Sequence, residues 1–273
     1  EIPGQVRHGD PYWDLEMLYH QHRYDDGLAM VDELLAASPG DPELYWHKVR
    51  FMFEVVERVD RTDTGIDKMS WYEEMLAVAE AGLLLAPDHG HLLFGKGVAL
   101  GRYGTTKGVL SSLSLAKPIE SSWQRCADSD YRYRSLAGEE MLPCDCLHTL
   151  GIFYRLVPDS WVVDLIAGTR GSLDKSLEYN QRADSCKPDD ISIEKELGVT
   201  QICLGQKRRD ESLVTAGRAH LLHLGSLPVR TPSDEIDQAH ARQILFDPSL
   251  ACGYSRDGQQ DLDQEKLEAQ APR

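Results

Sequence analysis

Apolar residues recur along most of this chain at three- and four-residue intervals, the spacing that places them on one face of an α-helix. Most of these stretches end in Gly, Pro, Asp or Ser, residues that stop one helix and cap the next. The pattern predicts helices over residues 11–22, 24–37, 41–59, 69–85, 90–103, 172–186, 190–205, 209–224 and 232–245. Because the connections are short, successive helices are predicted to pack as antiparallel hairpins.

One helix pattern occurs more than once. The W-x2-L-G-x2-Y spacing that opens a tetratricopeptide unit is met at Leu147, Leu150, Gly151 and Tyr154. Its Leu-Gly pair returns at residues 197–198, 47 positions later, and residues 93–100 share three positions of the same register. Gly on such a face lets a neighbouring helix approach closely, and each hairpin must stack on another to bury its apolar stripe. The sequence therefore predicts an all-α superhelical array of antiparallel helical hairpins, a tetratricopeptide-like solenoid.

Two inserted segments depart from this repeat. Residues 105–127 form an amphipathic stretch interrupted by a proline, which predicts an inserted kinked helix. Residues 158–172 lengthen the turn that follows the preceding helix, and such insertions in repeat proteins often fall on the working face. The predicted organisation is an N-terminal arm, a repeat domain and a flexible C-terminal tail, at residues 1–10, 11–246 and 247–273.

The charge balance restricts the partners. Lys and Arg total 29 against 45 Asp and Glu, a formal net charge of −16, so phosphate backbones and anionic lipid surfaces would be repelled over most of the surface. We expect no nucleic-acid partner. A basic protein face is compatible with this charge, although solubility alone would explain it. No apolar run approaches the roughly 20 residues that cross a bilayer, so no membrane span is predicted.

The cysteines indicate an oxidising compartment. Six are many for a helical cytosolic protein, and an even number permits disulfides. Four lie near predicted helix ends, where hairpins can be stapled: Cys126, Cys144, Cys146 and Cys186. Cys203 falls inside a predicted helix and is expected to be a small core residue. The first residues have no initiator Met, basic stretch or apolar stretch, so we expect a trimmed chain without its export signal and an extracytoplasmic location.

Motifs for nucleotides, metals and catalysis are incomplete. A G-x4-G-K match at residues 90–97 lacks the Ser or Thr that ligates magnesium, and a Cys-x-Cys-x-His run at 144–148 lacks the second ligand pair of a zinc site. His220 and His223 share a helix face without an H-E-x-x-H arrangement, so ordinary surface imidazoles are expected. There is no G-x-S-x-G elbow. We predict a non-catalytic protein with no cofactor and no metal.

The second insertion carries the candidate ligand-binding residues. Trp161 and Arg170 combine an aromatic ring and a guanidinium among apolar neighbours, which suits a cleft for an apolar or carboxylate-bearing small ligand. Lys107 and Lys117, on the other insertion, are further candidates for this cleft. The alternative is that the apolar residues of the insertion only fill the groove between hairpins.

The order of these parts resembles the T component of tripartite ATP-independent periplasmic transporters, a helical lipoprotein family. The resemblance covers roughly residues 10–246 and is carried by residues 103–110, 117–119, 147–158, 171–177 and 232–234. The eukaryotic regulator-of-microtubule-dynamics family looks similar over the central and final segments.

Resemblance to the transporter family implies a periplasmic, lipid-anchored protein that assembles as a trimer, pairs with a substrate-binding protein and has a channel through each protomer. The lipidated N-terminal Cys of that family is not in this chain, so an anchor would lie outside it. The glycine pair that the family often shows before Ser172 is reduced here to Arg170-Gly171.

We therefore predict a non-catalytic extracytoplasmic helical-repeat protein that works as a binding or adaptor module, associated with such a transporter and holding a substrate-binding protein, an apolar ligand or both. The first alternative is a generic tetratricopeptide scaffold that grips a peptide or protein in its concave groove. The second is an enzyme whose site has no recognised motif.

Overall fold

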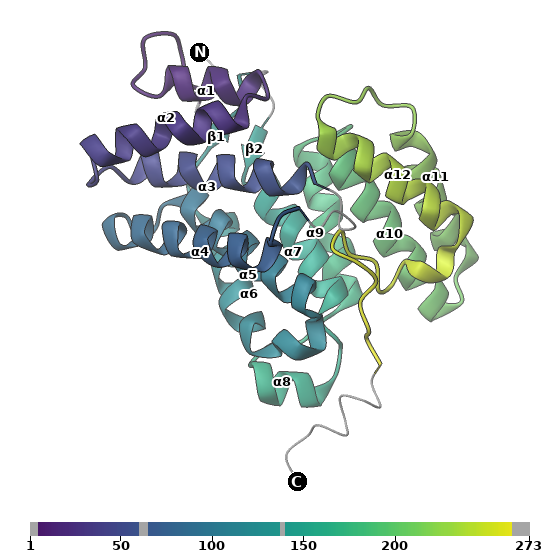
Figure 1. Ribbon diagram of the computed structural model, residues 1–273. Coiled ribbons are helices and arrows are strands. Elements are labelled where there is room, and N and C mark those ends of the chain that lie inside the picture. The colour runs from purple at the N-terminus through teal and green to yellow at the C-terminus, as the bar shows by residue number, and fades with distance from the viewer. Residues whose placement is uncertain (1–4, 60–64, 137–139, 264–273) are drawn as a thin grey trace. The chain divides into compact units, whose positions relative to one another are not determined.

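The computed structural model describes residues 5–59, 65–136 and 140–263. Over these residues the regular secondary structure consists of helices, one short β-hairpin of two strands and an isolated bridge (Figure 1). The helices are α1 (Trp13–His20), α2 (Tyr24–Ala37), α3 (Pro42–Glu57), α4 (Lys68–Leu85), α5 (Gly90–Lys107), α6 (Ala116–Asp128), α7 (Cys144–Leu156), α8 (Trp161–Ala167), α9 (Leu173–Cys186), α10 (Ile191–Arg208), α11 (Glu211–Leu224) and α12 (Pro232–Phe246). The predicted all-α array of hairpins is confirmed. None of the described helices is long and apolar enough to cross a membrane.

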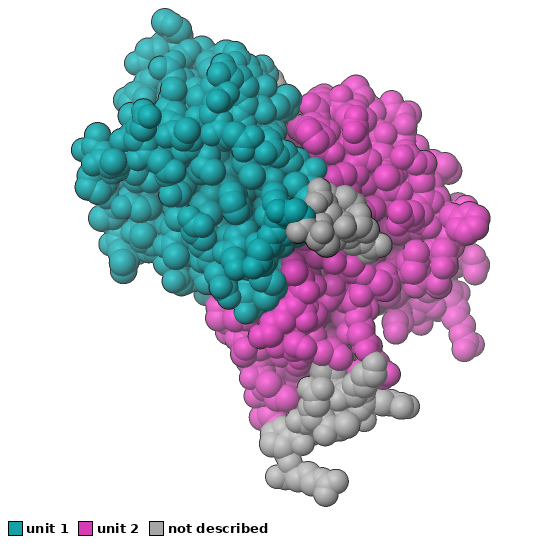
Figure 2. Space-filling view, in the orientation of Figure 1, with its two compact units in different colours: residues 1–103, 121–146 teal, residues 104–120, 147–273 magenta. Residues whose placement is uncertain are grey.

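The chain divides into two compact units, shown in separate colours in Figure 2. Unit 1 comprises residues 1–103 and 121–146, and unit 2 comprises residues 104–120 and 147–273. Each unit has its own buried apolar clusters, so each is described by itself.

Aspartates at the predicted stops cap several helices. Asp41, Asp190 and Asp210 each accept a hydrogen bond from the backbone N–H two residues later, at 3.0, 3.1 and 2.9 Å. Thr231 and Asp234 form a reciprocal capping box at the start of α12. These caps satisfy backbone donors that a helix leaves unpaired, and their charge complements the helix dipole. The sequence pattern therefore located these helix starts correctly.

Helices α1 to α4 pack in sequence order in unit 1. Leu15, Val31 and Phe51 lie in one buried cluster contributed by α1, α2 and α3. A side chain at Gly27 would overlap the ring of Phe51, so glycine there allows α2 to lie close against α3. A second cluster joins Trp46 of α3 to residues of α5 and of the hairpin.

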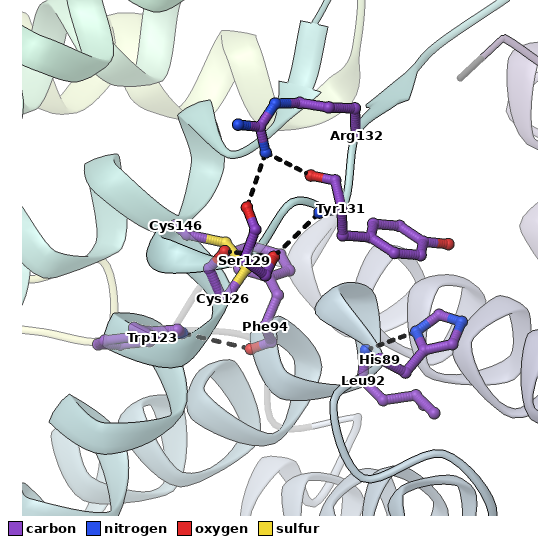
Figure 3. Close-up of a disulfide and its surroundings, with 9 residues drawn as sticks. All are labelled: His89, Leu92, Phe94, Trp123, Cys126, Ser129, Tyr131, Arg132 and Cys146. Carbon is purple, nitrogen blue, oxygen red and sulfur yellow. Dashed lines mark hydrogen bonds between the residues drawn. A yellow bond between two sulfur atoms is a disulfide. The ribbon is translucent and has the colours of Figure 1, made fainter. Parts of the chain in front are cut away.

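The hairpin of unit 1 was not predicted from the sequence. It pairs β1 (Tyr133–Arg134) with β2 (Glu140–Leu142) in antiparallel fashion, and Gln5 forms a bridge to Arg134. Near it, the Cys126–Cys146 disulfide joins the end of α6 to the start of α7 (Figure 3). The Trp123 indole N–H donates to the Phe94 carbonyl at 3.2 Å and ties α6 to α5.

Unit 2 is built around α10, which has buried residues on all sides from Ile191 to Gly205. Helices α9, α11 and α12 all contact it. A Cβ at Gly198 would lie 2.8 Å from the carbonyl oxygen of Gly217 on α11, so glycine is required for this close approach. Gly151 on α7 serves the same purpose against Asn180 on α9. The repeated Leu-Gly pair therefore marks close helix contacts, as predicted.

The two predicted insertions have structures of their own. The first consists of a 3-10 helix, η1 (Val109–Leu115), followed by α6, with Pro118 in the first turn of α6 where no N–H is needed. The kink is thus located at the junction of two helices. The second insertion contains α8, which begins after the Ser160 cap, ends at Gly168 in the left-handed conformation (φ 69°) and packs against η1.

Cys203 corrects one expectation from the sequence. It is buried in α10 but forms a disulfide with Cys252, so it is a cross-link as well as a core residue. The pairing was missed because Cys252 lies in the segment that was assigned to a C-terminal tail. The structure describes that segment as far as residue 263; it contains the 3-10 helix η2 (Pro248–Leu250) and buried Tyr254, whereas residues 264–273 lie outside the described part.

Removal of the Cys203–Cys252 disulfide should cost more stability than removal of Cys126–Cys146. The two bonds close 49 and 20 residues of sequence, and loop-closure entropy gives about 4 and about 3 kcal/mol for loops of these lengths. Double Cys→Ser variants, which leave no odd thiol, can be compared by urea unfolding.

Thiol titration of the denatured parent chain should detect no free thiol, since all six cysteines are disulfide-bonded. Six reactive thiols would contradict this structure.

Candidate functional site

The four candidate ligand-binding residues lie on or beside the two insertions. Trp161 is the first residue of α8, and its side chain is exposed. Arg170 forms an exposed ion pair with Asp159 at 3.5 Å, and Lys117 pairs with Glu120 at 2.8 Å. The Lys117 Cγ lies 4.0 Å from the Cβ position of Gly168 at the end of α8, so the two insertions do meet there. Lys107 ends α5, beyond the other end of η1, and is also exposed.

Helix α8 has a buried face and an exposed apolar face. Val162 and Val163 are fully buried, as expected if the insertion fills a groove. Trp161, Leu165 and Ile166, which we call the α8 patch, remain 64%, 66% and 44% exposed. Trp161 and Leu165 lie four residues apart and so share one face of the helix. Because exposed apolar side chains that lie together often mark interaction sites in soluble proteins, the α8 patch is a candidate binding surface.

A polar cluster on the neighbouring helices of unit 2 was not predicted from the sequence. Glu120 accepts hydrogen bonds from the Tyr154 hydroxyl at 2.6 Å and from Lys117 at 2.8 Å. Burial acts to raise the pKa of Glu120, but these hydrogen bonds outweigh it and hold the pKa below its usual value. The Tyr154 ring stacks on Tyr179, and Lys175 Nζ lies 4.8 Å from the centroid of the Tyr154 ring. Repeat spacing identified Tyr154 only as a packing residue.

Unit 1 contains a buried charge pair that holds the hairpin. Arg50 of α3 donates to Glu16 of α1 at 2.6 Å and to the Tyr133 hydroxyl at 3.1 Å. Its guanidinium also lies over the ring of Tyr19, 3.3 Å from the centroid. Both hydrogen bonds come from Arg50 Nη1; they pair the buried charge with a carboxylate and attach β1 to the first helices of two helical hairpins.

Two buried imidazoles stack on Trp46 in the same region. The ring centroids of His47 and His91 lie 4.4 and 3.7 Å from that of Trp46. Burial lowers the pKa of both imidazoles well below the usual range, and neighbouring positive groups lower it further. At neutral pH both rings are therefore uncharged packing groups. Tyr131, drawn in Figure 3 beside His89, covers His91 edge-on at 5.0 Å.

A larger buried ionic network organises unit 2. Arg155 of α7 donates to Glu196 of α10 at 2.7 Å and to three backbone carbonyls of the C-terminal segment, those of Ala251, Cys252 and Tyr254. Lys195 of α10 donates to Asp237 of α12 at 2.7 Å, and Asp237 also accepts from Arg256 at 2.8 Å. Glu196 and Asp237 thus each have a cationic partner. Such paired charges form a structural network, whereas a catalytic acid or base would need a free position for substrate.

In both units the first helices of the hairpins are covered by the chain itself. We call this side of a unit its first-helix face. In unit 1 the β1–β2 hairpin lies on α3 and α5. Its Tyr133 contacts Arg50 of α3 and the ring of His91 of α5. In unit 2 residues 248–260 lie on α7, α10 and α12 through the contacts of Arg155, Lys195 and Asp237.

A mixed cluster of imidazoles and carboxylates lies at the turn between α9 and α10. His223 Nε2 is 2.9 Å from Asp189 Oδ1, and His220 Nδ1 is 2.6 Å from Glu194 Oε2. The hydrogen bond to Glu194 raises the pKa of His220, although burial opposes it. One ligand atom each of Asp189, Glu194 and His223 lie within 4.8 Å of one another. The sequence identified the two histidines but did not connect them with these acids, which come from a different segment of the chain.

Comparison with known proteins supports the fold. No family model and no curated protein matches the chain. A tetratricopeptide protein of Thermus thermophilus, TTC0263, is 16% identical and matches over 87% of this chain and 98% of its own, with a TM-score of 0.55. Weaker matches are MamA from Desulfovibrio magneticus RS-1 (16% identity, 77% and 92% coverage, TM-score 0.44) and YrrB (14%, 81% and 88%, TM-score 0.42). The chain thus has a tetratricopeptide-repeat fold. The comparisons do not assign it to a particular family.

Substitution of Arg155 should destabilise the protein strongly. Arg155→Met removes the nearer of the two cations beside buried Glu196, leaving Lys195 Nζ at 3.4 Å, and also removes the donor to three carbonyls; breaking a buried pair in this way costs about 3–5 kcal/mol. Arg208→Met is the matched control, because the Arg208–Asp174 pair is exposed, with side-chain exposures of 51% and 69%. Urea unfolding should show a large loss for the first variant and almost none for the second. Equal losses would mean that the buried network contributes no more than a surface pair.

Acid should destabilise unit 2 through His148. Burial lowers its pKa to about 4, outweighing the opposing effect of Glu196 and Asp190. Because the unfolded imidazole, with a pKa near 6.5, takes up a proton that the folded one refuses, stability falls as pH drops from about 6.5 to about 4, by about 2 kcal/mol at pH 5. Between pH 7 and pH 5 the free energy of unfolding should fall less in the His148→Gln variant than in the parent chain. An unchanged difference between the two pH values would contradict this assignment.

Proposed function

We propose that this protein is a non-catalytic helical-repeat scaffold of an oxidising, extracytoplasmic compartment, and that it binds a protein partner through the α8 patch. The observation that carries the proposal is the exposure of Trp161 and Leu165, four residues apart on one face of a helix inserted into the repeat, with Ile166 also exposed on that helix. Large side chains with few rotatable bonds, such as Trp, supply contact area at low entropic cost and are typical of binding hot spots.

The state of the cysteines supports the compartment. All six are in disulfides, and cytosolic thiols are normally kept reduced. The bonds also stabilise segments outside the hairpins, since Cys252 attaches the C-terminal segment to α10. On the resemblance to the transporter T component, we further propose the periplasm as the compartment and a substrate-binding protein as the partner.

The covered first-helix faces favour the α8 patch over the usual groove of repeat proteins. Extended repeat arrays bind partners along a concave surface. In unit 2, the first helices are already engaged by Arg155 with three carbonyls and by Asp237 with Arg256. A peptide would have to displace these buried contacts, whereas the α8 patch needs no displacement. The generic alternative, peptide binding in the repeat groove, is therefore less favoured in this chain.

The groups around the α8 patch fit a mixed partner surface. Asp159 and Arg170 flank α8 in the sequence, Asp164 is exposed within it, and Lys117 Cγ lies 4.0 Å from the Cβ position of Gly168 at its end. Protein interfaces commonly have this arrangement of an apolar centre with a polar rim. The same centre and cations suit an apolar small carboxylate, which is the narrower ligand that the residue types of the insertion indicate.

Loss of the α8 patch should abolish partner binding without unfolding the protein. A Trp161→Ala, Leu165→Ala variant, compared with the parent in pull-downs from an extract of extracytoplasmic proteins, should fail to recover a partner that the parent retains. Leu222→Ala is the matched control, since Leu222 on α11 is also 64% exposed and lies outside the patch. Circular dichroism and thermal melting should be unchanged in both variants.

Two results would count against the proposal. Recovery of the same partner by the double variant would remove the α8 patch from the interface. Equal loss in the Leu222→Ala control would show that recovery follows general surface hydrophobicity.

The small ligand is checked in parallel by titrating the parent chain with a medium-chain fatty acid and following tryptophan fluorescence. If the parent saturates and Arg170→Gln binds with unchanged affinity, a carboxylate contact at Arg170 is excluded.

A further inference from the structure

Three ligand-type side chains converge from separate elements of unit 2. Asp189 lies in the turn between α9 and α10, Glu194 lies in the first turn of α10, and His223 lies in the last turn of α11. Their ligand atoms are within 4.8 Å of one another. His223 presents Nε2 to Asp189, and this is an atom through which imidazoles commonly bind metals.

The supporting residues hold two of these side chains in place. Asp190 caps α10 by accepting from the backbone N–H groups of Ser192 and Ile193, both at 3.1 Å, and so fixes the turn that carries Asp189. Glu194 is only 5% exposed, and its Oε2 lies 2.6 Å from His220 Nδ1. A buried carboxylate oriented by an imidazole is the kind of outer support that metal ligands usually have.

The donor set selects the class of cation. One imidazole nitrogen and two carboxylates provide three protein ligands and leave further positions for water, which suits Zn²⁺ and related first-row metals. Magnesium and calcium favour sites made only of oxygen. The two carboxylates also balance the charge of a dication. Thiols do not compete for the metal, because all six cysteines are in disulfides.

We propose that Asp189, Glu194 and His223 bind one divalent cation of the zinc class, with His220 positioning Glu194. The site joins the α9–α10 turn to α10 and α11, so an occupied site would tie together two adjacent hairpins of the repeat. It is independent of the α8 patch, since it uses none of its residues. Its role is to stabilise unit 2 when the metal is present.

The test uses the untagged full chain, freed of metal with a chelator and titrated with zinc chloride by calorimetry. We expect saturation near one zinc per chain and a higher thermal midpoint with zinc, with no comparable effect of magnesium or calcium. Asp189→Asn and His223→Asn should each weaken binding at least tenfold. Both residues are exposed, so these variants should fold, which circular dichroism can verify.

A matched control separates this site from general histidine binding. His20 is an exposed histidine at the end of α1 in unit 1, and His20→Asn should keep the affinity of the parent chain. Absence of saturable zinc binding in the parent would overturn the proposal. Equal affinities in the Asp189→Asn, His223→Asn and His20→Asn variants would also overturn it, because the zinc would then be bound elsewhere. A preference for calcium would contradict the assigned class of cation, because calcium favours sites made only of oxygen.

Discussion

The close packing around α10 is the constraint on which unit 2 depends. Gly198 lets α11 approach so closely that α10 is surrounded, and the helix is buried over several turns although its sequence contains charged residues. Glu194, Lys195 and Glu196 are consecutive and therefore point in different directions around the helix. Each reaches a different neighbour, His220 on α11, Asp237 on α12 and Arg155 on α7.

Because of these three pairs, burial of α10 depends on the positions of α7, α11 and α12. An unpaired charge inside a protein is costly, so burial of α10 is favourable when these partners are in place. Arg155 extends the dependence to the C-terminal segment, because the same guanidinium satisfies Glu196 and the carbonyls of three residues. The Cys203–Cys252 disulfide fixes the same segment covalently. A stretch without helical repeat character is thereby made part of the fold.

Unit 1 uses the same principle with different residues. Arg50 pairs with Glu16 and with the hydroxyl of Tyr133, so a buried charge on a first helix again captures a non-helical segment. In both units a buried arginine of the first-helix face binds a segment of the chain itself. Function is then expected on surfaces that the repeat does not need, the inserted α8 and the α9–α10 turn.

The sequence by itself determined the helices and the way they pair, whereas only the tertiary structure decided which distant residues meet. Apolar periodicity, aspartate caps and the Leu-Gly pairs are local signals, and they predicted the all-α hairpin array and the close contact at Gly198. The exposure of Trp161 could not be obtained in this way, because a short apolar helix looks the same whether it is buried or exposed. The Cys203–Cys252 bond, the hairpin around Tyr133 and the course of residues 248–260 were missed because they depend on partners far away in the sequence. Local propensity records none of these long-range pairings, whereas the folded chain makes them through desolvated charges and a covalent bond.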